Sequence, residues 1–396
     1  MAFQRGCSRV RGLHRSLTTQ QAPTTSSTYW HSQIRAGDPV YVGMSGGVDS
    51  SVAAYLLKER GAQVTGLFMR NWDTRDEHGE CPSERDWRDV QQVCGQLGIP
   101  CRQINLVKEY WNRVFAVALD DFAAGRTPNP DILCNREIKF GVLLNEINRR
   151  LPGGTRLATG HYARVAGRGD LWRGVDRKKD QSYYLSAVKS SQLQHALFPL
   201  GGLTKSTDVR RLAREAGLAT AEKEESMGIC FVGERRRFDH FLAEYLPQRD
   251  GDILASDMRV VGRHQGLFSR TIGQNARIPG MASKWFIYAK DPATNRMFAT
   301  QDRSSPLLYQ KSVVAGPVHW ISGTSPDFGP ANQLALDAQV RYMQLPQACM
   351  VAPSADPAYP NHIVVRFADA QFGVASGQYV VLYQGAQCLG SAQIQQ

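Results

Sequence analysis

The stretch Gly43-Met44-Ser45-Gly46-Gly47-Val48-Asp49-Ser50-Ser51 decides the fold of this chain. Residues 40–42 before it form a short apolar strand pattern, and Val48, Val52 and Leu56 recur four apart, the spacing of one helix face. Glycines let the backbone turn tightly, so successive N–H groups can converge on an anion, and the helix start adds unpaired donors. The sequence therefore predicts a phosphate-binding turn between a strand and a helix.

The side chains of this turn are suited to binding phosphate. Ser45, Ser50 and Ser51 can donate hydroxyl hydrogen bonds to phosphate oxygens, whereas Asp49 is interpreted as a metal-side or helix-capping residue. A Walker loop would need a lysine here and a dinucleotide fingerprint would need G-x-G-x-x-G, and the stretch has neither. The alternative without a ligand is a Gly-Gly turn capped by serine. The strand–turn–helix setting favours the phosphate-binding interpretation.

Strand and helix patterns alternate outward from the turn as far as residue 242. Apolar runs predict strands near 64–69, 101–106 and 157–159, and helical spacing predicts helices near 87–97, 107–122, 137–148 and 204–218. This alternation is typical of a doubly wound α/β domain with a parallel sheet. Short strands separated by turn residues follow, and from residue 310 onward they predict a small β-barrel. The expected units are residues 1–37, a catalytic domain over 38–242, a small central domain over 243–309 and a barrel over 310–396.

Charge separates the first 37 residues from the rest of the chain. They hold five arginines and no acidic residue, which leaves an excess of +6 from the net charge of +11 for residues 38–396. An acid-free segment rich in Arg, Ser and Thr predicts a mitochondrial transit peptide, with a disordered tail as the alternative. The moderate remaining excess is compatible with nucleic-acid binding without demanding it. No run of about 18 apolar residues is present, so no membrane span is expected.

Two of the eight cysteines stand apart, and none has zinc-type spacing. Cys134 follows a proline-rich loop that is expected to end at a helix start, where the macrodipole favours a thiolate, and Asp131 is close enough in sequence to exchange a proton. A buried core cysteine is the equal alternative for Cys134. Cys230 lies in an Ile-Cys-Phe triplet, which is more often core than catalytic, but its flanking glycines favour a mobile segment.

At this point the turn resembles the PP-loop, S-G-G-x-D-S, of the N-type ATP pyrophosphatases, which share an adenine nucleotide alpha hydrolase-like fold. The wider set of motifs resembles the tRNA-specific 2-thiouridylase family, and with the N-terminal extension its mitochondrial form is the closest match. The matching segments, in the order of the family, are Gly43–Ser51, Gly66–Trp72, Thr127–Phe140, Ala158–Arg164, Lys179–Leu185 and Gly228–Glu234.

The resemblance implies a role for each matching position. ATP, with Mg²⁺, would be held by Gly43, Met44, Ser45, Gly46, Gly47, Val48, Asp49, Ser50, Met69 and Gly160. Contacts with tRNA would come from Asn129, Pro130, Asp131, His161, Lys179, Asp180, Gln181, Arg341, Tyr342 and Gln378, the first three receiving the flipped base. Cys134 matches the nucleophile, and Cys230 matches the cysteine that carries persulfide sulfur from a cysteine desulfurase relay.

The implied reaction replaces O2 of the wobble uridine with sulfur in the mitochondrial matrix. Adenylation makes the oxygen a good leaving group, and the persulfide sulfur either attacks directly or is released as sulfide when Cys134 closes a disulfide with Cys230. One departure affects RNA binding: after residues 271–274 the family usually continues Arg-Lys-Gly-Leu, but here Asn275-Ala276-Arg277-Ile278 follows.

Two other functions compete with this one. A PP-loop ligase or amidotransferase would leave Cys134 and Cys230 without a role. A non-catalytic tRNA-binding or sulfur-relay protein would not need the intact turn together with Asp131 and both cysteines.

Overall fold

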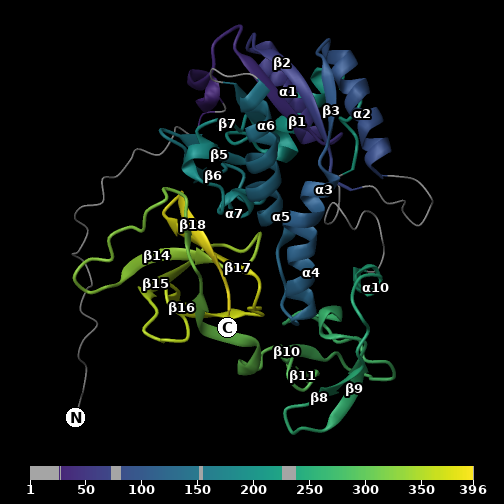
Figure 1. Ribbon diagram of the computed structural model, residues 1–396, viewed down its shortest axis with the longest axis vertical. Coiled ribbons are helices and arrows are strands. Elements are labelled where there is room, and N and C mark those ends of the chain that lie inside the picture. Colours follow the sequence, from purple (N-terminus) through teal and green to yellow (C-terminus); the bar gives the residue numbers. More distant parts are fainter. Residues whose placement is uncertain (1–25, 27, 73–81, 151–154, 225–237, 396) are drawn as a thin grey trace, which may run out of the picture.

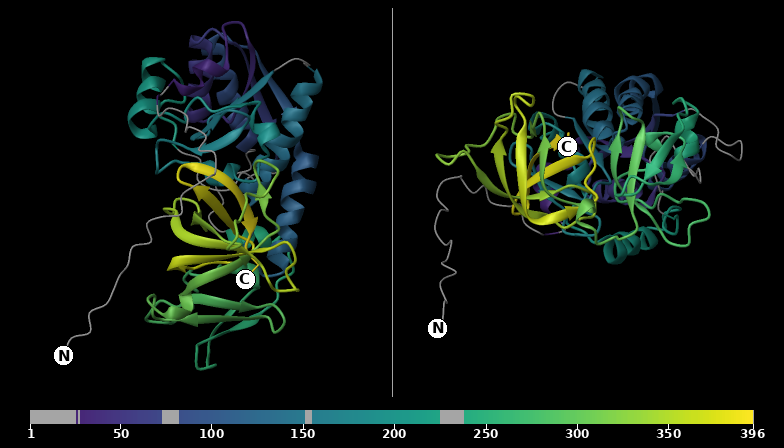
Figure 2. Two further views of the ribbon diagram at one scale, coloured as in Figure 1. Left: turned by 90° about the vertical axis from the view of Figure 1, so that its left-hand side faces the viewer. Right: turned by 90° about the horizontal axis from the view of Figure 1, so that it is seen from below.

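The computed structural model describes residue 26 and residues 28–72, 82–150, 155–224 and 238–395. A parallel sheet lies at the top of Figure 1, with a barrel and a four-stranded sheet below it, and the left view of Figure 2 shows the barrel between the other two parts. None of the helices in this described part of the chain is long and apolar enough to cross a membrane.

The parallel sheet confirms the predicted doubly wound α/β domain. Its strand order is β3-β2-β1-β4-β7, so the chain adds strands first on one side of β1 and then on the other. Val42 in β1 and Ala158 in β4 are fully buried, as expected for strands covered on both faces. The strands are β1 Pro39–Met44, β2 Gln63–Arg70, β3 Cys101–Asn105, β4 Arg156–Thr159 and β7 Ala196–Leu197.

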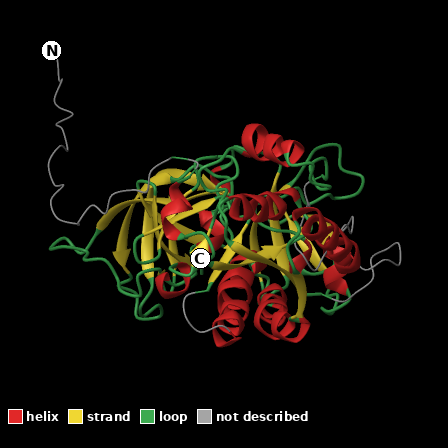
Figure 3. Cartoon of the chain, turned by 90° about the horizontal axis from the view of Figure 1, so that it is seen from above, coloured by secondary structure: helices red, strands yellow, loops and turns green. Residues whose placement is uncertain are grey.

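Helices cover both faces of this sheet (Figure 3) and pack into two separate hydrophobic cores. One core joins α1 and α2 to the sheet. The other contains residues of α3, η2 and α4, which follow β3, and of α5 and η3. The predicted C-terminal end of α2 is confirmed: Gly98, the residue after the helix, has φ +60°, a left-handed conformation that glycine adopts easily. The helices are α1 Val48–Glu59, α2 Pro82–Leu97, α3 Val107–Tyr110, η2 Trp111–Phe115, α4 Ala116–Ala123, α5 Pro130–Leu133, η3 Cys134–Leu143, α6 Leu144–Arg150, α7 Ser182–Leu185, α8 Ser190–Leu193, η4 Lys205–Val209, α9 Arg210–Glu215 and α10 Phe238–Ala243.

The folded part of the chain begins earlier than the sequence suggested. Residues 28–37 were assigned to a leader or disordered tail, but they contain the short 3₁₀ helix η1, Tyr29–Gln33. Trp30 is 1% exposed and Ile34 is 3% exposed within the core that contains α1. The hydroxyl of Tyr29 donates hydrogen bonds to the carbonyl oxygens of Phe198, at 2.7 Å, and Ala163, at 3.1 Å. Because an apolar side chain buried this deeply belongs to the fold, the boundary at residue 37 is wrong for these residues.

The central domain is a four-stranded sheet with the order β10-β11-β8-β9. Its small core contains Ile287, Met297 and Ala299, each fully buried. The elements are β8 Gly251–Leu254, β9 Val260–His264, η5 Leu267–Ser269, β10 Phe286–Asp291, β11 Arg296–Thr300 and η6 Pro306–Leu308.

The C-terminal strands form the predicted β-barrel, with the order β12-β16-β15-β14-β17-β18. A β-bridge between Ala315 and Ile394 joins the end of the first strand to the residue after the last one and closes the sheet. The sequence did not predict that the hairpin β5–β6 of the catalytic half would pair with β18 and extend the same sheet. The strands are β5 Ala163–Ala166, β6 Asp170–Arg173, β12 Tyr309–Ala315, β13 His319–Trp320, β14 Leu334–Gln339, β15 Gln347–Pro353, β16 Ile363–Phe372, β17 Tyr379–Gln384 and β18 Gln387–Gln393.

Candidate active site

The Ser45–Ser51 turn connects β1 to α1 and is braced by its own hydroxyl groups. The Ser45 amide donates to Ser50 Oγ at 3.1 Å, and Ser50 Oγ donates to the Gly47 carbonyl at 3.1 Å. Ser51 Oγ donates to the same carbonyl at 2.9 Å, and Ser51 is fully buried. The sequence suggested that Ser51 contacts a phosphate. Its hydroxyl instead supports the backbone of the turn from the buried side.

Two glycines permit close backbone contacts around the turn. Gly46 has φ +74°, and a Cβ there would lie 2.8 Å from the carbonyl oxygen of Asp86. A Cβ on Gly160, which follows β4, would lie 2.8 Å from the amide nitrogen of Ser50. Because real Cβ atoms do not approach backbone so closely, both positions require glycine.

A cavity of about 190 Å³ opens beside the turn, and most predicted ATP-binding residues line it. The sequence-predicted residues Gly46, Gly47 and Val48 belong to the turn but do not line the cavity. Lys139, Leu143 and Thr159 line it as well, although the sequence analysis assigned them no role. The full lining is Gly43, Met44, Ser45, Asp49, Ser50, Met69, Lys139, Leu143, Thr159, Gly160, His161 and Gln181.

Asp49 is fixed by two residues that the sequence analysis missed. Its Oδ1 accepts a hydrogen bond from the Tyr162 hydroxyl at 2.7 Å, and its Oδ2 pairs with Lys205 Nζ at 2.7 Å. The N-cap of α1 is Gly47, with no side-chain hydrogen bond to the helix start, so the helix-capping interpretation of Asp49 is wrong. The lysine offsets the carboxylate charge, which reduces its repulsion of a phosphate in the cavity.

A second lysine reaches the turn from the far side. Lys223 Nζ donates to the carbonyl oxygen of Gly46 at 3.1 Å and to Asp86 Oδ1 at 3.0 Å, and it also contacts Asp89. The two carboxylates lie in α2, so Lys223 ties that helix to the turn. Local sequence gives no signal for either lysine contact, because each one joins residues more than 100 positions apart.

The Asp131–Cys134 segment is already helical, which corrects the prediction that Cys134 lies at a helix start. Asn129 is the N-cap and its Oδ1 accepts from the Ile132 amide at 3.4 Å, while Pro130 occupies the first helical position. Cys134 follows α5 directly and is 4% exposed within the hydrophobic core. The macrodipole acts mainly on the first turn, so it does not activate this thiol as expected.

Lys139 connects the cavity with Asp131 electrostatically. Burial raises the pKa of the Asp131 carboxyl, and the positive charge of Lys139 acts in the opposite direction. Burial and the same lysine hold the pKa of His161 well below its usual range, and His161 Nδ1 is hydrogen-bonded to Thr159 Oγ1 at 2.7 Å. His161, predicted as a tRNA contact, is thus a neutral imidazole that is 7% exposed and lines the cavity.

Several other residues predicted to contact tRNA have well-defined contacts within the protein. Gln378 Nε2 donates to the Thr127 carbonyl at 2.8 Å, which holds the loop before Asn129. Asp180 is 7% exposed, and its carboxylate pairs with Arg173 Nε at 2.6 Å. Gln181 lines the cavity and accepts from the Tyr162 amide at 3.2 Å.

Arg341 and Tyr342 lie in the turn that follows β14 of the barrel. The ring centroid of Tyr342 lies 4.4 Å from that of Tyr184, whose pKa is raised by burial and by the nearby carboxylate of Asp131. Lys179, by contrast, is partly exposed at the end of the turn that follows β6. Cys230 and its neighbours over 228–234 lie outside the residues that the structure describes.

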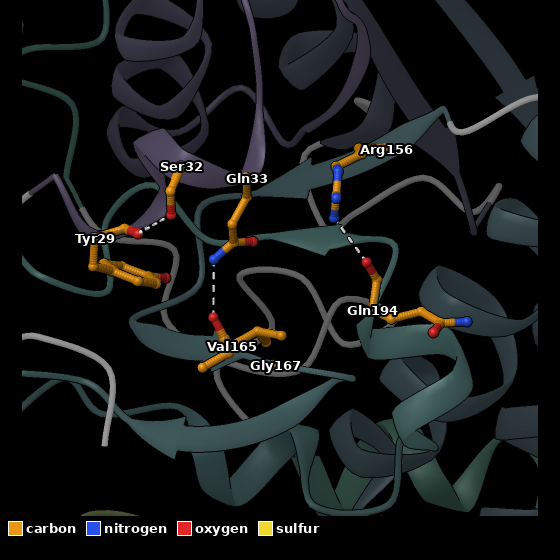
Figure 4. A pocket seen from close by; sticks show the side chains of 8 residues that line it. Tyr29, Ser32, Gln33, Arg156, Val165, Gly167 and Gln194 are labelled. Atoms are coloured by element: carbon orange, nitrogen blue, oxygen red, sulfur yellow. Dashed lines mark hydrogen bonds between the residues drawn. The ribbon is translucent and has the colours of Figure 1, made fainter. Parts of the chain in front are cut away.

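A larger pocket of about 330 Å³ lies away from these residues, between η1 and the β5–β6 hairpin (Figure 4). Gln33 Nε2 donates to the Val165 carbonyl at 2.9 Å, and Arg156 Nη1 donates to the Gln194 carbonyl at 2.7 Å. None of the predicted site residues lines this pocket, so the smaller cavity is the candidate active site. Within the described ranges, no group of three or more His, Cys, Asp or Glu residues could hold a metal ion.

Comparison with known proteins identifies the family. Residues 38–234 match the tRNA methyl transferase HUP domain, 239–301 the tRNA methyl transferase PRC-barrel domain and 310–394 the aminomethyltransferase beta-barrel domain. The tRNA-specific 2-thiouridylase of Legionella pneumophila (strain Lens) is 43% identical over 366 residues, covering 90% of this chain and 98% of the relative. That of Xanthomonas euvesicatoria pv. vesicatoria (strain 85-10) is 46% identical over 364 residues, covering 90% and 93%.

Similarity to solved structures is lower. A 4-thiouridine synthetase–RNA complex with bound ATP gives a TM-score of 0.33 at 18% identity, covering 50% of this chain and 46% of the other, too little to bear on function. The extent and level of the sequence matches leave no doubt about ancestry. The chain belongs to the tRNA-specific 2-thiouridylase family.

Proposed function

We propose that this protein is an ATP-dependent tRNA uridine 2-sulfurtransferase that makes 2-thiouridine at the wobble position of mitochondrial tRNAs. The observation that carries the proposal is the position of Lys139, which lines the cavity beside the Ser45–Ser51 turn and also acts on Asp131. Asp131 and Cys134 lie on the same helix as Lys139, so the nucleotide cavity and the thiol belong to one site.

The residues around the cavity suit an adenylation step. The serine hydroxyls and the turn amides would bind ATP phosphates, while Lys139 would stabilise negative charge that develops on the α-phosphate. The uridine O2 attacks that phosphorus, and pyrophosphate leaves. Mg²⁺ would enter with the nucleotide, with the carboxylate of Asp49 in the cavity lining and phosphate oxygens as ligands.

Sulfur then replaces the activated oxygen. In one route the terminal sulfur of a Cys230 persulfide attacks C2, AMP leaves, and the Cys134 thiolate attacks Cys230 Sγ to release 2-thiouridine. In the other route the Cys134 thiolate first attacks Cys230 Sγ and displaces the terminal sulfur as sulfide, which then attacks C2 and expels AMP. Both routes end with a Cys134–Cys230 disulfide, which an external thiol reduces before the next turnover. The raised pKa of Asp131 suits a group that exchanges a proton at this site.

Persulfide sulfur would arrive from a donor protein of a cysteine desulfurase relay. The acid-free leader composition supports import into mitochondria, and because residues 28–37 are folded, any leader would end before Thr28. A fluorescent fusion of residues 1–27 tests this: the proposal expects mitochondrial fluorescence, and a cytosolic signal would contradict it.

The activity test uses the full chain with unmodified mitochondrial tRNA, ATP, Mg²⁺ and a persulfide source, followed by nucleoside mass spectrometry. We expect 2-thiouridine from the wild type and none from Cys134→Ser or Cys230→Ser, with tRNA binding nearly intact in both. Cys101→Ala, which changes a partly exposed cysteine in β3, is the matched control and should retain activity. If the folded wild-type protein binds tRNA but forms no thiolated nucleoside, the proposed activity is wrong.

A further inference from the structure

Two arginines share one aromatic ring where the central domain meets the barrel. Arg303 lies in the connection between β11 and η6, and its Cζ is 5.5 Å from the ring centroid of Phe372 at the end of β16. Arg341, which follows β14, has its Cζ 5.6 Å from the same centroid. The short helix η6, which follows Arg303, contacts both β10 of the central domain and β12 of the barrel. The two positive charges are therefore no further apart than the sum of these two distances.

Aromatic and glycine contacts fix the position of the shared ring. Phe372 packs edge to face against Tyr309, with the centroids 5.4 Å apart. A Cβ on Gly273 would lie 3.0 Å from the Phe372 ring, so the 271–274 motif of the central domain lies directly against it. Arg303 also lies over Phe286 of β10, with its Cζ 5.9 Å from that centroid. The Arg303 side chain is thus held by rings of both domains.

Neither guanidinium has a hydrogen-bond acceptor or carboxylate partner among the described residues. The neighbouring acid, Asp302, directs its carboxylate to Ser304, with the backbone amide donating to Oδ1 at 2.8 Å. A guanidinium carries five N–H donors, and arginines that stack on rings keep those donors available for a planar anion. Two such groups held close together form a preorganised site for phosphate oxygens.

A line of contacts connects this site with the candidate active site. Arg341 is followed by Tyr342, which stacks on Tyr184, and the Tyr184 carbonyl accepts from Asn135 Nδ2 at 3.2 Å. Asn135 is adjacent to Cys134 in the helix. A nucleic-acid strand bound at Arg303 would therefore extend toward the Asp131–Cys134 helix.

We infer that Arg303 and Arg341, held on Phe372, bind backbone phosphates of the tRNA whose uridine enters the active site. This inference rests on the proposed function, and it adds a site that includes Arg303 and Phe372 to the previously implied contact by Arg341. Arg303 also supplies a cation close to the 271–274 motif. At the two positions after that motif the family usually has Arg-Lys, and this chain has Asn275 and Ala276.

The test measures the equilibrium affinity for unmodified tRNA without ATP, as a function of salt, for the wild type, Arg303→Met and Arg303→Lys. Methionine keeps a long apolar side chain over the rings and removes the charge. Loss of one phosphate contact should weaken binding about fivefold and reduce the slope of log K against log salt by about 0.7–0.9. Arg303→Lys should keep most of the slope, because lysine keeps the positive charge.

Arg259→Met is the matched control, since Arg259 is an exposed arginine of the same domain that lies 3.8 Å from Asp257. The inference is overturned if Arg303→Met binds tRNA with wild-type affinity and slope, or if the control loses as much. A lower melting temperature with an unchanged slope would assign Arg303 a purely structural role and also overturn it. A wild-type protein that binds no tRNA would contradict the proposed function itself, whereas a wild type that thiolates tRNA with an unaffected Arg303→Met leaves that function standing.

Discussion

The Ser45–Ser51 turn and the Asn129–Cys134 segment contribute to one site, but they are held in place in different ways. Several of the hydrogen bonds that brace the turn join residues within the turn itself, such as Ser45, Gly47 and Ser50. The second segment is held by residues from other domains: Gln378 binds the Thr127 carbonyl at 2.8 Å, and Thr127 Oγ1 is 2.7 Å from Thr271 Oγ1. The shape of the nucleotide turn is therefore largely locally encoded, although Lys205 and Lys223 reach it from distant positions, whereas the thiol half depends on the assembled chain.

The loop that precedes Asp131 is held by both the barrel and the central domain. The Thr127 amide donates to the Ser376 carbonyl at 2.8 Å, and a Cβ on Gly377 would lie 2.8 Å from the Thr127 nitrogen. Barrel and central domain therefore both support the loop that precedes Asp131. We expect variants in the barrel to slow the chemical step without touching the nucleotide.

Gly46→Ala should have the largest effect, because it breaks the locally encoded half. The substitution forces a Cβ into a positive-φ position and toward Asp86, which should lower the free energy of unfolding by about 2–4 kcal/mol and pyrophosphate release by about 100-fold. Urea unfolding and pyrophosphate release measure the two effects. Gly95→Ala in α2, where a Cβ would meet nothing within 4 Å, should retain activity and gain about 0.5–1 kcal/mol. Wild-type pyrophosphate release by Gly46→Ala would show that the turn tolerates a side chain.

Lys139→Ala should affect both halves, since Lys139 lies between them. We expect kcat to fall by about 10- to 100-fold through lost charge stabilisation, with Lys139→Arg recovering part of the rate. Lys139 opposes the burial that raises the pKa of Asp131, so removing its charge should raise that pKa further. The acidic limb of the pH–rate profile should then move to higher pH, and an unmoved limb would separate Lys139 from Asp131.

Gln378→Ala tests whether the barrel positions the thiol half. Loss of the hydrogen bond to the Thr127 carbonyl should reduce kcat for thiolation by about tenfold, while the KM for ATP stays near that of the wild type. Gln395→Ala is the control, because Gln395 Nε2 donates to a barrel carbonyl, that of Gly316, at 3.1 Å. Weaker tRNA binding with an unchanged kcat would instead make Gln378 a tRNA contact, as the family resemblance implied.

Lys290→Met should have the smallest effect, confined to the pH dependence of stability. Lys290 Nζ donates to the carbonyl of Gly125, just before the loop, and burial lowers its pKa from 10.5 to about 7. Between these values the unfolded chain binds a proton that the folded chain does not, so stability rises with pH, by at most about 1.4 kcal/mol per pH unit. Urea unfolding of Lys290→Met from pH 6.5 to 9 should lose this rise, and an unchanged slope would show that Lys290 titrates normally.

By itself the sequence predicted the features that depend on short-range geometry. The turn, the alternation of strands and helices, and the barrel follow from glycine positions and from the periods of apolar residues, which act over a few residues. Asp131 and Cys134 could also be singled out, because a proline-rich loop and a nearby carboxylate are visible in sequence. The start of that helix was misplaced, since the Asn129 cap and Pro130 begin it within the stretch expected to be a loop.

Only the tertiary structure decided which distant residues complete the site. Lys205 reaches Asp49 across 156 positions, Lys223 reaches Gly46 across 177, and Gln378 reaches Thr127 across 251. A long side chain that pairs with a residue so far away leaves no periodic pattern, because the pairing is set by the packing of domains and not by local spacing. The same reason explains why the β5–β6 hairpin joined the barrel sheet, and why Arg303 came to share a ring with Arg341.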